Sequence, residues 1–267
     1  KQWNRLKKYC NRRGIRIFGD LPIYVAMESS DVWSHPAYFK LHKNRKPEYI
    51  AGVPPDLFSD TGQLWGNPVY DWKAVKEDGY QWWIQRFRYN LRLYDCIRLD
   101  HFRGFAGFWQ VKAGEKTAQN GRWVPGPGRD FFDVLLKYIL PSNLIAEDLG
   151  VITDDVRKLA ADYDLPGMKV LQFAFYDNPA RSPYAPHNHT ENSVVYTGTH
   201  DNNTVRGWYE NELDSDSRKY LRRYTASNVN KQNVHRQMIQ MAMRSVCRLC
   251  IIPVQDLLGK GAEAQMN

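Results

Sequence analysis

Short apolar runs alternate along this chain with longer segments in which apolar residues recur every three or four positions. Each short run ends in a polar or acidic residue, and its length and composition are typical of a buried β-strand. We predict six strands, at residues 14–20, 96–100, 143–150, 169–176, 193–201 and 249–256. The longer segments have the spacing of amphipathic helices. The clearest helices are predicted at residues 78–94, 129–140, 153–163 (with Thr153 as the N-cap) and 231–246.

Strands that alternate with helices predict a parallel sheet, either doubly wound or closed into a (β/α)8 barrel. Asp20, Asp100, Glu147, Asp201 and Asp256 each end a different predicted strand, and a barrel rim gathers that many strand ends around one site. No G-x-G-x-x-G or phosphate-binding loop follows the first strand, which disfavours a nucleotide-binding sheet. We therefore predict an α/β fold of the (β/α)8 TIM barrel type. It is incomplete in this chain, because six strands are two fewer than a closed barrel needs.

Two long segments interrupt the repeat, at about residues 24–80 and about residues 202–233. The first is rich in Pro, Gly, Trp and Tyr, and loops of this length at the catalytic rim of a barrel usually form substrate sites. We predict that residues 1–267 form one partial catalytic barrel that includes both segments as insertions.

The composition excludes a disordered chain, because 267 residues of which 43% are hydrophobic can bury a large core. No apolar run approaches the roughly 18 residues that a membrane span needs, and the basic beginning of the chain contains no apolar signal core. We expect no membrane association. The chain begins with Lys1 rather than methionine and stops without an evident terminal element, so we expect a piece of a longer chain.

The formal net charge of +8 raises the question of nucleic-acid binding. The basic clusters, at residues 5–16, 40–46 and 217–224, are dispersed and resemble solvated helix faces and loops rather than one stripe. No nucleic-acid-binding motif accompanies them, so we expect no nucleic-acid partner.

Four cysteines in a chain of this length do not form a disulfide framework and indicate a reducing cytoplasm, or a plastid if the source is a plant or alga. Cys247 and Cys250 form a C-x-x-C motif, which raises the question of a metal or redox site. No second pair or histidine lies at zinc-finger spacing, and the flanking residues predict a buried strand. We expect no metal at this motif.

The segment CIRLDHFRGF, residues 96–105, ends a predicted buried strand in a cluster of charge. A carboxylate there must be solvated, paired or hydrogen-bonded, because burying it bare costs several kcal/mol. Arg98 lies two positions before Asp100 and therefore on the same face of the strand, where it would keep the acid ionised and oriented. An oriented carboxylate is what a glycosidic nucleophile requires.

Two further acids extend this pattern. Glu147 is flanked by apolar residues, so a raised pKa would suit it to protonate a leaving oxygen. Asp201 supplies a third carboxylate, with His200 beside it as a neutral donor to sugar hydroxyls. Taken singly, Asp100 is as well explained by a structural ion pair, Glu147 by the end of a strand, and His200 by a rim position. Their shared position at successive strand ends favours a barrel glycosidase.

Aromatic residues agree with a sugar substrate. The nine Trp and sixteen Tyr are many for this length, and several lie in the predicted rim loops, where their flat faces could stack on sugar rings. Core packing explains a large share of them, including at least one of Trp82 and Trp83 within the helix pattern.

Six motifs resemble those of the amylomaltases, the 4-α-glucanotransferases or disproportionating enzymes of glycoside hydrolase family 77. They are GDLPIYVA (19–26), GVPPDLFSDTGQLWGNPVYDW (52–72), IRLDHFRGF (97–105), AEDLG (146–150), GTHDN (198–202) and IIPVQDLLG (251–259). They occur in the family's order across nearly the entire chain. The resemblance implies a retaining transferase on a (β/α)8 barrel, with no required metal or organic cofactor and with malto-oligosaccharides and α-1,4-glucans as partners.

The resemblance also assigns roles to individual residues. It implies that Asp100 is the nucleophile, Glu147 the general acid/base and Asp201 the stabiliser of the transition state. Around the sugar it implies contacts from Asp20, Arg98, His101 and His200, and from a covering loop with Trp65 and Asn67. Many members have an aromatic residue where this chain has Leu57, so we expect stacking by that loop to depend on Phe58.

The family's chains are about twice this length, and the comparison makes the visible strands the third to the eighth of the barrel. The alternatives to a 4-α-glucanotransferase are an amylase-like α-glucan hydrolase with the same acids and a non-catalytic glucan-binding remnant. Motifs separate the first two poorly, because transfer depends on how well the covering loops exclude water.

Overall fold

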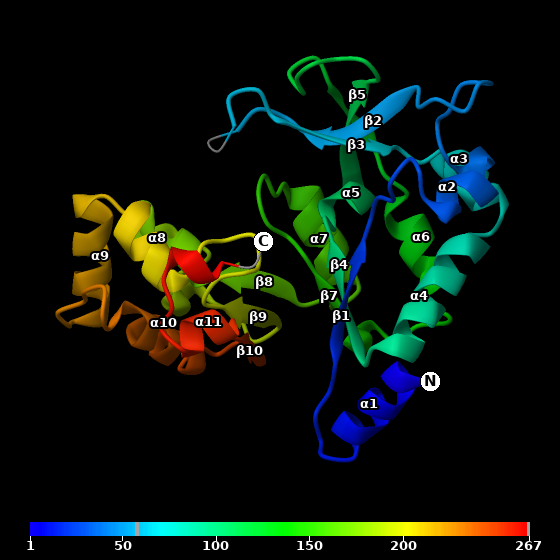
Figure 1. Ribbon diagram of the computed structural model, residues 1–267. Helices are drawn as coiled ribbons and strands as arrows, with labels where there is room; N and C mark the ends of the chain where they lie inside the picture. Colours follow the sequence, from blue (N-terminus) through cyan, green and yellow to red (C-terminus); the bar gives the residue numbers. More distant parts are fainter. Residues whose placement is uncertain (57–58, 266–267) are drawn as a thin grey trace. The chain divides into compact units, whose positions relative to one another are not determined.

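The computed structural model describes residues 1–56 and 59–265. The chain forms two compact units, Lys1–Leu165 and Pro166–Asn267 (Figure 1). Among the described residues, no helix is both long and apolar enough to cross a membrane.

The first unit contains a three-stranded parallel sheet in the order β1-β4-β7, with β4 in the middle (Figure 1). Its strands are β1 (Phe18–Pro22), β4 (Cys96–Asp100) and β7 (Leu144–Ala146). Ile97 and Leu99 of β4 are buried, whereas the residues between and after them, Arg98 and Asp100, are only partly buried on the opposite face. This alternation directs the charged side chains of β4 to one face of the sheet.

Helices pack beside this sheet around an aromatic core. The fully buried side chains include Trp83 and Phe87 of α4, Phe105 of α5 and Phe131 of α6, which contact one another through their rings. Burying each such side chain contributes on the order of 2 kcal/mol. The helices of this unit are α1 (Gln2–Asn11), α2 (Ser30–Ser34), α3 (Trp72–Glu77), α4 (Gln81–Leu93), α5 (Arg103–Ala106), α6 (Gly128–Leu135) and α7 (Asp154–Asp162).

A second sheet of the first unit is antiparallel and has the order β3-β2-β5-β6. It consists of β2 (Tyr49–Val53), β3 (Gln63–Pro68), β5 (Gly107–Lys112) and β6 (Arg122–Pro125). Strands β2 and β3 lie within the predicted insertion at about residues 24–80, whereas β5 and β6 lie outside it and were not predicted as strands. The long-range pairing of β2 with β5 leaves no local signal in the sequence, because its hydrogen bonds join residues far apart in the chain.

The second unit contains a parallel sheet in the order β10-β9-β8. Its strands are β8 (Gly167–Val170), β9 (Ser193–Tyr196) and β10 (Leu249–Ile251). The helices of the unit are α8 (Val205–Asn211), α9 (Ser215–Thr225), α10 (Val234–Met243) and α11 (Val254–Leu257). Trp208 of α8 and Met238 of α10 are fully buried in its core.

All six predicted strands are present at least in part. Strand β4 has its predicted bounds, and the other five are shorter than predicted. Strand β1 continues past Asp20 to Pro22, and β9 ends at Tyr196, so Asp20 lies within a strand and Asp201 lies on a loop instead of ending one. The largest corrections concern residues 171–175, which form a 3-10 helix, and Asp256, which lies in α11 instead of ending a strand. Pro253 accounts for the second difference, because it has no N–H for the ladder and instead precedes the first turn of α11. The closure of the two parallel sheets into one barrel, and thus into one domain of residues 1–267, stays a prediction.

The four clearest predicted helices are present as α4, α6, α7 and α10. Thr153 occupies the N-cap position of α7 as expected, but its side chain does not cap the helix. Its hydroxyl donates to the carboxylate of Asp155 instead, so the predicted capping contact is wrong.

Candidate functional site

The charged face of β1 and β4 is organised by Arg98. Asp20 of β1 is the direct parallel partner of Arg98 on β4, so both side chains project from the same face of the sheet. Arg98 Nε donates to Asp20 Oδ1 at 2.8 Å, and Nη2 donates to Asp20 Oδ2 at 2.7 Å. Nη2 also donates to Asp100 Oδ1 at 3.2 Å. One guanidinium thus orients two carboxylates by charge-assisted hydrogen bonds.

The side chain of Arg98 is much less exposed to solvent than the two carboxylates that it contacts. The side chain of Arg98 is 12% exposed, whereas those of Asp20 and Asp100 are 47% and 39% exposed. Burial of the guanidinium opposes its charge, but Asp20, Asp100 and Glu147 outweigh this effect and raise the pKa of Arg98. The cation is therefore permanent, and the carboxylates beside it remain accessible to a substrate.

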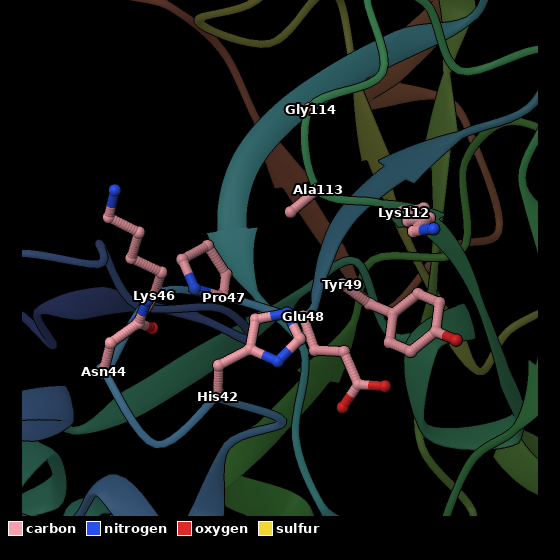
Figure 2. A pocket seen from close by; sticks show the side chains of 9 residues that line it. All are labelled: His42, Asn44, Lys46, Pro47, Glu48, Tyr49, Lys112, Ala113 and Gly114. Carbon is pink, nitrogen blue, oxygen red and sulfur yellow. The ribbon is translucent and has the colours of Figure 1, made fainter.

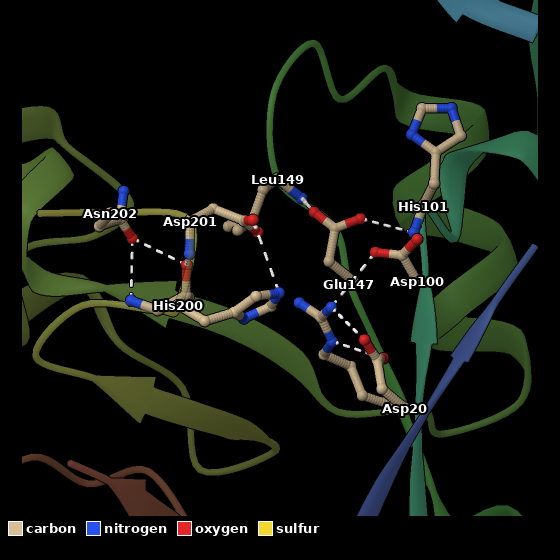
Figure 3. Close-up of polar contacts among 10 residues, drawn as sticks. Asp20, Asp100, His101, Glu147, Leu149, His200, Asp201 and Asn202 are labelled. Carbon is tan, nitrogen blue, oxygen red and sulfur yellow. Dashed lines mark hydrogen bonds and ion pairs between the residues drawn. The ribbon is translucent and has the colours of Figure 1, made fainter. Parts of the chain in front are cut away.

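Glu147 directly follows β7 and is held by backbone amides. The N–H of His101 donates to Glu147 Oε2 at 2.7 Å, and the N–H of Leu149 donates to Oε1 at 3.1 Å (Figure 3). His101 has a φ of 50°, in the left-handed region that a non-glycine residue seldom adopts. Strain of this kind persists where the surrounding structure enforces it, and here it accompanies the amide contact to Glu147.

The environment of Glu147 favours its protonated form. Burial, followed by the nearby charge of Asp100, raises the pKa of Glu147 from 4.5 to about 7, against the opposing effects of Arg98 and the two amides. Strands β4 and β7 pair in register, with Leu99 opposite Ala146, so Asp100 and Glu147 occupy equivalent positions at the ends of adjacent strands. The site thus combines one carboxylate beside a fixed cation with one carboxyl whose pKa lies close to neutral pH.

The imidazole of His101 lies within an aromatic group of the same unit. Its ring is 4.7 Å from that of Trp65, with the planes at 87°, and 6.3 Å from that of Tyr24. Burial, followed by Arg103, lowers the pKa of His101 to about 3, so the ring is neutral at physiological pH. Its buried Nε2 has no hydrogen-bond partner among the described residues.

The remaining residues predicted from the covering loop lie on or near β3. Trp65 is 36% exposed and therefore offers one face to a ligand, whereas Asn67 is half-buried. Phe58, which we expected to stack on the substrate, and Leu57 lie outside the described residues. Sequence reasoning did not single out Tyr24, although it lies beside both Trp65 and His101. Its position in the GDLPIYVA motif was the available signal.

The second unit carries Asp201 and His200 on the loop that follows β9. His200 Nε2 lies 3.5 Å from Asp201 Oδ1, and both side chains are exposed. A local turn holds the backbone of this loop, because the N–H and the hydroxyl of Thr199 both donate to Asn202 Oδ1 at 2.9 Å (Figure 3). The N–H of Asp201 donates to the Thr199 hydroxyl at 3.3 Å. The second unit therefore presents an exposed carboxylate on an ordered turn.

A separate pocket of about 580 Å³ lies on the antiparallel sheet of the first unit. Its lining includes His42, Lys46, Tyr49 and Lys112, and none of the predicted site residues (Figure 2). Across the described residues, no group of three or more His, Cys, Asp or Glu side chains is arranged to bind a metal ion. Cys247 and Cys250 are free thiols, and Cys250 lies in β10, which is half-buried rather than buried as we predicted.

Of the predicted residues, the first unit thus brings together Asp20, Arg98, Asp100, His101, Glu147 and Trp65. A pair of carboxyls at the ends of adjacent parallel strands, one paired with a cation and one with a raised pKa, is the arrangement that carboxylate-based glycoside chemistry uses. Residues 1–267 match the model of glycoside hydrolase family 77, described as 4-alpha-glucanotransferase, and the chain belongs to this family.

Curated relatives agree with the family. The chain is 50% identical to the 4-alpha-glucanotransferase of Aquifex aeolicus, over 100% of this chain and 54% of the relative. It is also 50% identical to the chloroplastic/amyloplastic 4-alpha-glucanotransferase of Solanum tuberosum, over 100% of this chain and 46% of the relative. The chain therefore spans about half the length of the curated relatives it matches.

Solved structures show the same architecture. The amylomaltase of Streptococcus agalactiae in complex with acarbose matches with a TM-score of 0.95 at 41% identity, covering 100% of this chain and 53% of that one. The amylomaltase of Corynebacterium glutamicum matches with a TM-score of 0.80 at 19% identity, covering 95% of this chain and 41% of that one, which is a likeness of fold.

Proposed function

We propose that the protein is a 4-α-glucanotransferase, which moves α-1,4-glucan segments between malto-oligosaccharides by a retaining double displacement. The observation that carries this proposal is the pair formed by Asp100 and Glu147, on adjacent strands and in opposite protonation environments. A retaining mechanism needs one ionised nucleophile and one acid that later acts as a base. Family membership and the named relatives support the same activity.

In the first half of the cycle, Glu147 donates its proton to the glycosidic oxygen as the bond to the leaving glucan breaks. Asp100 attacks the anomeric carbon from the opposite face and forms a covalent glucosyl-enzyme. The hydrogen bond from Arg98 keeps the Asp100 carboxylate oriented for this attack. The raised pKa of Glu147 keeps the proton on the enzyme until the leaving oxygen takes it.

In the second half, the Glu147 carboxylate removes the proton from the 4-hydroxyl of an incoming glucan, and this oxygen displaces Asp100. The anomeric configuration is retained, and Glu147 regains its proton. Asp201 supplies the charge that stabilises the oxocarbenium-like transition state, from its exposed position in the second unit. The proposal thus gives each carboxylate a role that fits its surroundings.

Further polar and aromatic groups complete the proposed substrate site. The unpartnered Nε2 of His101 and the carboxylate of Asp20 offer hydrogen bonds to sugar hydroxyls, as does His200. Trp65 provides a stacking face, and Asn67 and Phe58 belong to the same proposed cover. The acarbose complex of the Streptococcus agalactiae amylomaltase supports an oligosaccharide ligand. We further propose that residues 1–267 contribute strands three to eight of a (β/α)8 barrel.

Product analysis with pure maltotriose tests this proposal. Incubation of the full-length protein, followed by chromatography of the oligosaccharides, should yield glucose, maltopentaose and a longer ladder. Glucose and maltose without longer products would mean that water is the acceptor, and an α-glucan hydrolase would replace the transferase. Unchanged maltotriose would leave the non-catalytic glucan-binding protein as the explanation.

A further inference from the structure

Asp256 has no role in the proposed mechanism. Its side chain is nevertheless of interest, because a carboxylate that is only 1% exposed is unusual. It lies in α11, within the motif IIPVQDLLG. Its Oδ2 accepts from the hydroxyl of Thr197 at 2.7 Å, and its Oδ1 accepts from the backbone N–H of Val205 at 2.7 Å. A buried carboxylate is costly unless its oxygens are satisfied, and here each oxygen has a short hydrogen bond.

The two donors to Asp256 mark the two ends of one loop. Thr197 directly follows β9, and Val205 is the first residue of α8. We call residues 197–205 the anchor loop, since both of its ends are attached to the same carboxylate. Asp201 lies in the middle of the anchor loop, so its carboxylate is presented from a segment that is closed at its base.

Further hydrogen bonds and packing contacts within the second unit fix the backbone of the anchor loop. Gln172, which is 1% exposed, donates through Nε2 to the carbonyl oxygen of Asn203 at 2.9 Å. Thr204 caps α8, because its hydroxyl accepts from the N–H of Gly207 at 3.1 Å. Gly198 packs against the Gln172 amide, where an added Cβ would lie 2.8 Å from Nε2. Several residues thus define the backbone of this loop, and Asp256 is the one that joins its two ends.

We propose that Asp256 is a positioning residue for Asp201: it closes the anchor loop and thereby sets where the Asp201 carboxylate meets the transition state. This inference rests on the proposed function. Asp256 does not itself reach the solvent, so it acts through the loop backbone. A displacement of about 1 Å at a reacting centre is enough to lower a rate about a hundredfold.

Turnover measurements on the full-length protein test the inference. Asp256→Ala removes both acceptors, and we expect kcat to fall by about 10- to 100-fold while KM changes less than about threefold. Asp256→Asn should recover most of the loss, because its amide oxygen still accepts from Val205 and its NH2 group can donate to the Thr197 hydroxyl. A loss confined to thermal stability, with kcat unchanged for the folded enzyme, would overturn the proposal.

Two further variants test the proposal even if Asp256→Ala does not fold. Thr197→Val removes only the donor at the start of the anchor loop and should lower kcat by about 2- to 10-fold. Ser193→Ala is the matched control, since it removes a buried hydroxyl from the opposite end of β9, where Ser193 contacts Thr190. An equal fall of kcat in both variants would overturn the positioning role.

A double-mutant cycle tests whether Asp256 acts through Asp201. In an Asp201→Ala background, the additional Asp256→Ala change should alter kcat less than about twofold. An undiminished effect in that background would show that Asp256 acts by another route and would contradict the proposal.

Hydrogen exchange separates this proposal from the proposed function. If the wild-type protein has no activity on maltotriose, the proposed function fails, but the anchoring contacts can still be tested. Thr197→Val and Asp256→Ala should speed amide exchange in residues 197–205, and Ser193→Ala should not. Unchanged exchange in the anchor loop would overturn the anchoring itself.

Discussion

The two units present their carboxylates in different ways. In the first unit, Asp100 and Glu147 lie at the ends of paired strands, and a partly buried guanidinium and backbone amides contact their oxygens directly. In the second unit, the carboxylate of Asp201 is exposed on a turn, and the buried groups that define its position contact the backbone around it.

The two units thus hold their carboxylates in place in different ways: the first through contacts to the carboxyl oxygens, the second through contacts to the backbone. A carboxyl beside a low-dielectric core must have its charge state controlled, so its side chain needs partners. The carboxylate of Asp201 lies on an exposed turn, and the contacts that specify its position include those of the backbone around it. We therefore expect variants of the first unit to change chemistry and protonation, and variants of the second unit to change geometry.

The largest effect should come from Asp100→Asn. Loss of the nucleophile removes the covalent path, and we expect kcat to fall at least about 10⁴-fold while glucan binding persists. Turnover of maltotriose and calorimetric binding of a longer glucan check the two parts. Turnover within tenfold of wild type would remove Asp100 from the nucleophile role.

Glu147→Gln should lower kcat by about 10²- to 10⁴-fold on maltotriose, because the leaving oxygen is no longer protonated. An α-glucosyl fluoride needs no such proton, so formation of the glucosyl-enzyme from this donor should be largely restored. Rapid-mixing measurements of fluoride release check the expectation. Equal losses on both donors would argue against a general acid at this position.

Arg98→Ala removes the cation shared by Asp20 and Asp100. A hydrogen bond to a charged group contributes about 1.5–3 kcal/mol, so we expect kcat/KM to fall by about 10- to 100-fold. Arg98→Lys should recover little, because an ammonium cannot reproduce the paired contacts of the guanidinium with Asp20. Full recovery by lysine would show that charge alone matters.

The pH profile should reflect Glu147. Since this residue must carry its proton to act as an acid, kcat/KM should fall about tenfold per pH unit above its pKa of about 7. The charge of Asp100 contributes to the raised value, so Asp100→Asn should lower the pKa of Glu147. Carboxyl NMR of labelled glutamate measures this shift, and an unchanged titration would contradict the electrostatic coupling.

The smallest effect should come from Thr199→Val in the second unit. The substitution keeps the shape of the side chain and removes its hydrogen bonds with Asn202 and with the N–H of Asp201. Neutral hydrogen bonds contribute about 0.5–1.5 kcal/mol, so kcat should fall by about 2- to 10-fold with no change in the pH profile. A shifted pH profile would break the contrast between the two units.

Local sequence patterns predicted the six strands, the four clearest helices and the pairing of Arg98 with Asp100. Each of these depends on residues close together in the chain. Two details differ from the expectations although their causes are local. The hydroxyl of Thr153, at the predicted N-cap position, contacts Asp155 two residues away, and Asp256 lies in a helix that begins after Pro253. The antiparallel sheet of the first unit was not predicted, since its paired strands β2 (Tyr49–Val53) and β5 (Gly107–Lys112) lie far apart in the chain.

The sequence by itself determined which residues we propose for the chemistry, because acids after apolar runs and the six family motifs are visible in the order of residues. Only the tertiary structure decided the state of those residues. The contact of Arg98 with Asp20, the backbone amides on Glu147 and the closure of the anchor loop by Asp256 all join positions distant in the chain. Burial and hydrogen bonding, which set charge and position, arise only when the folded chain brings these distant groups together.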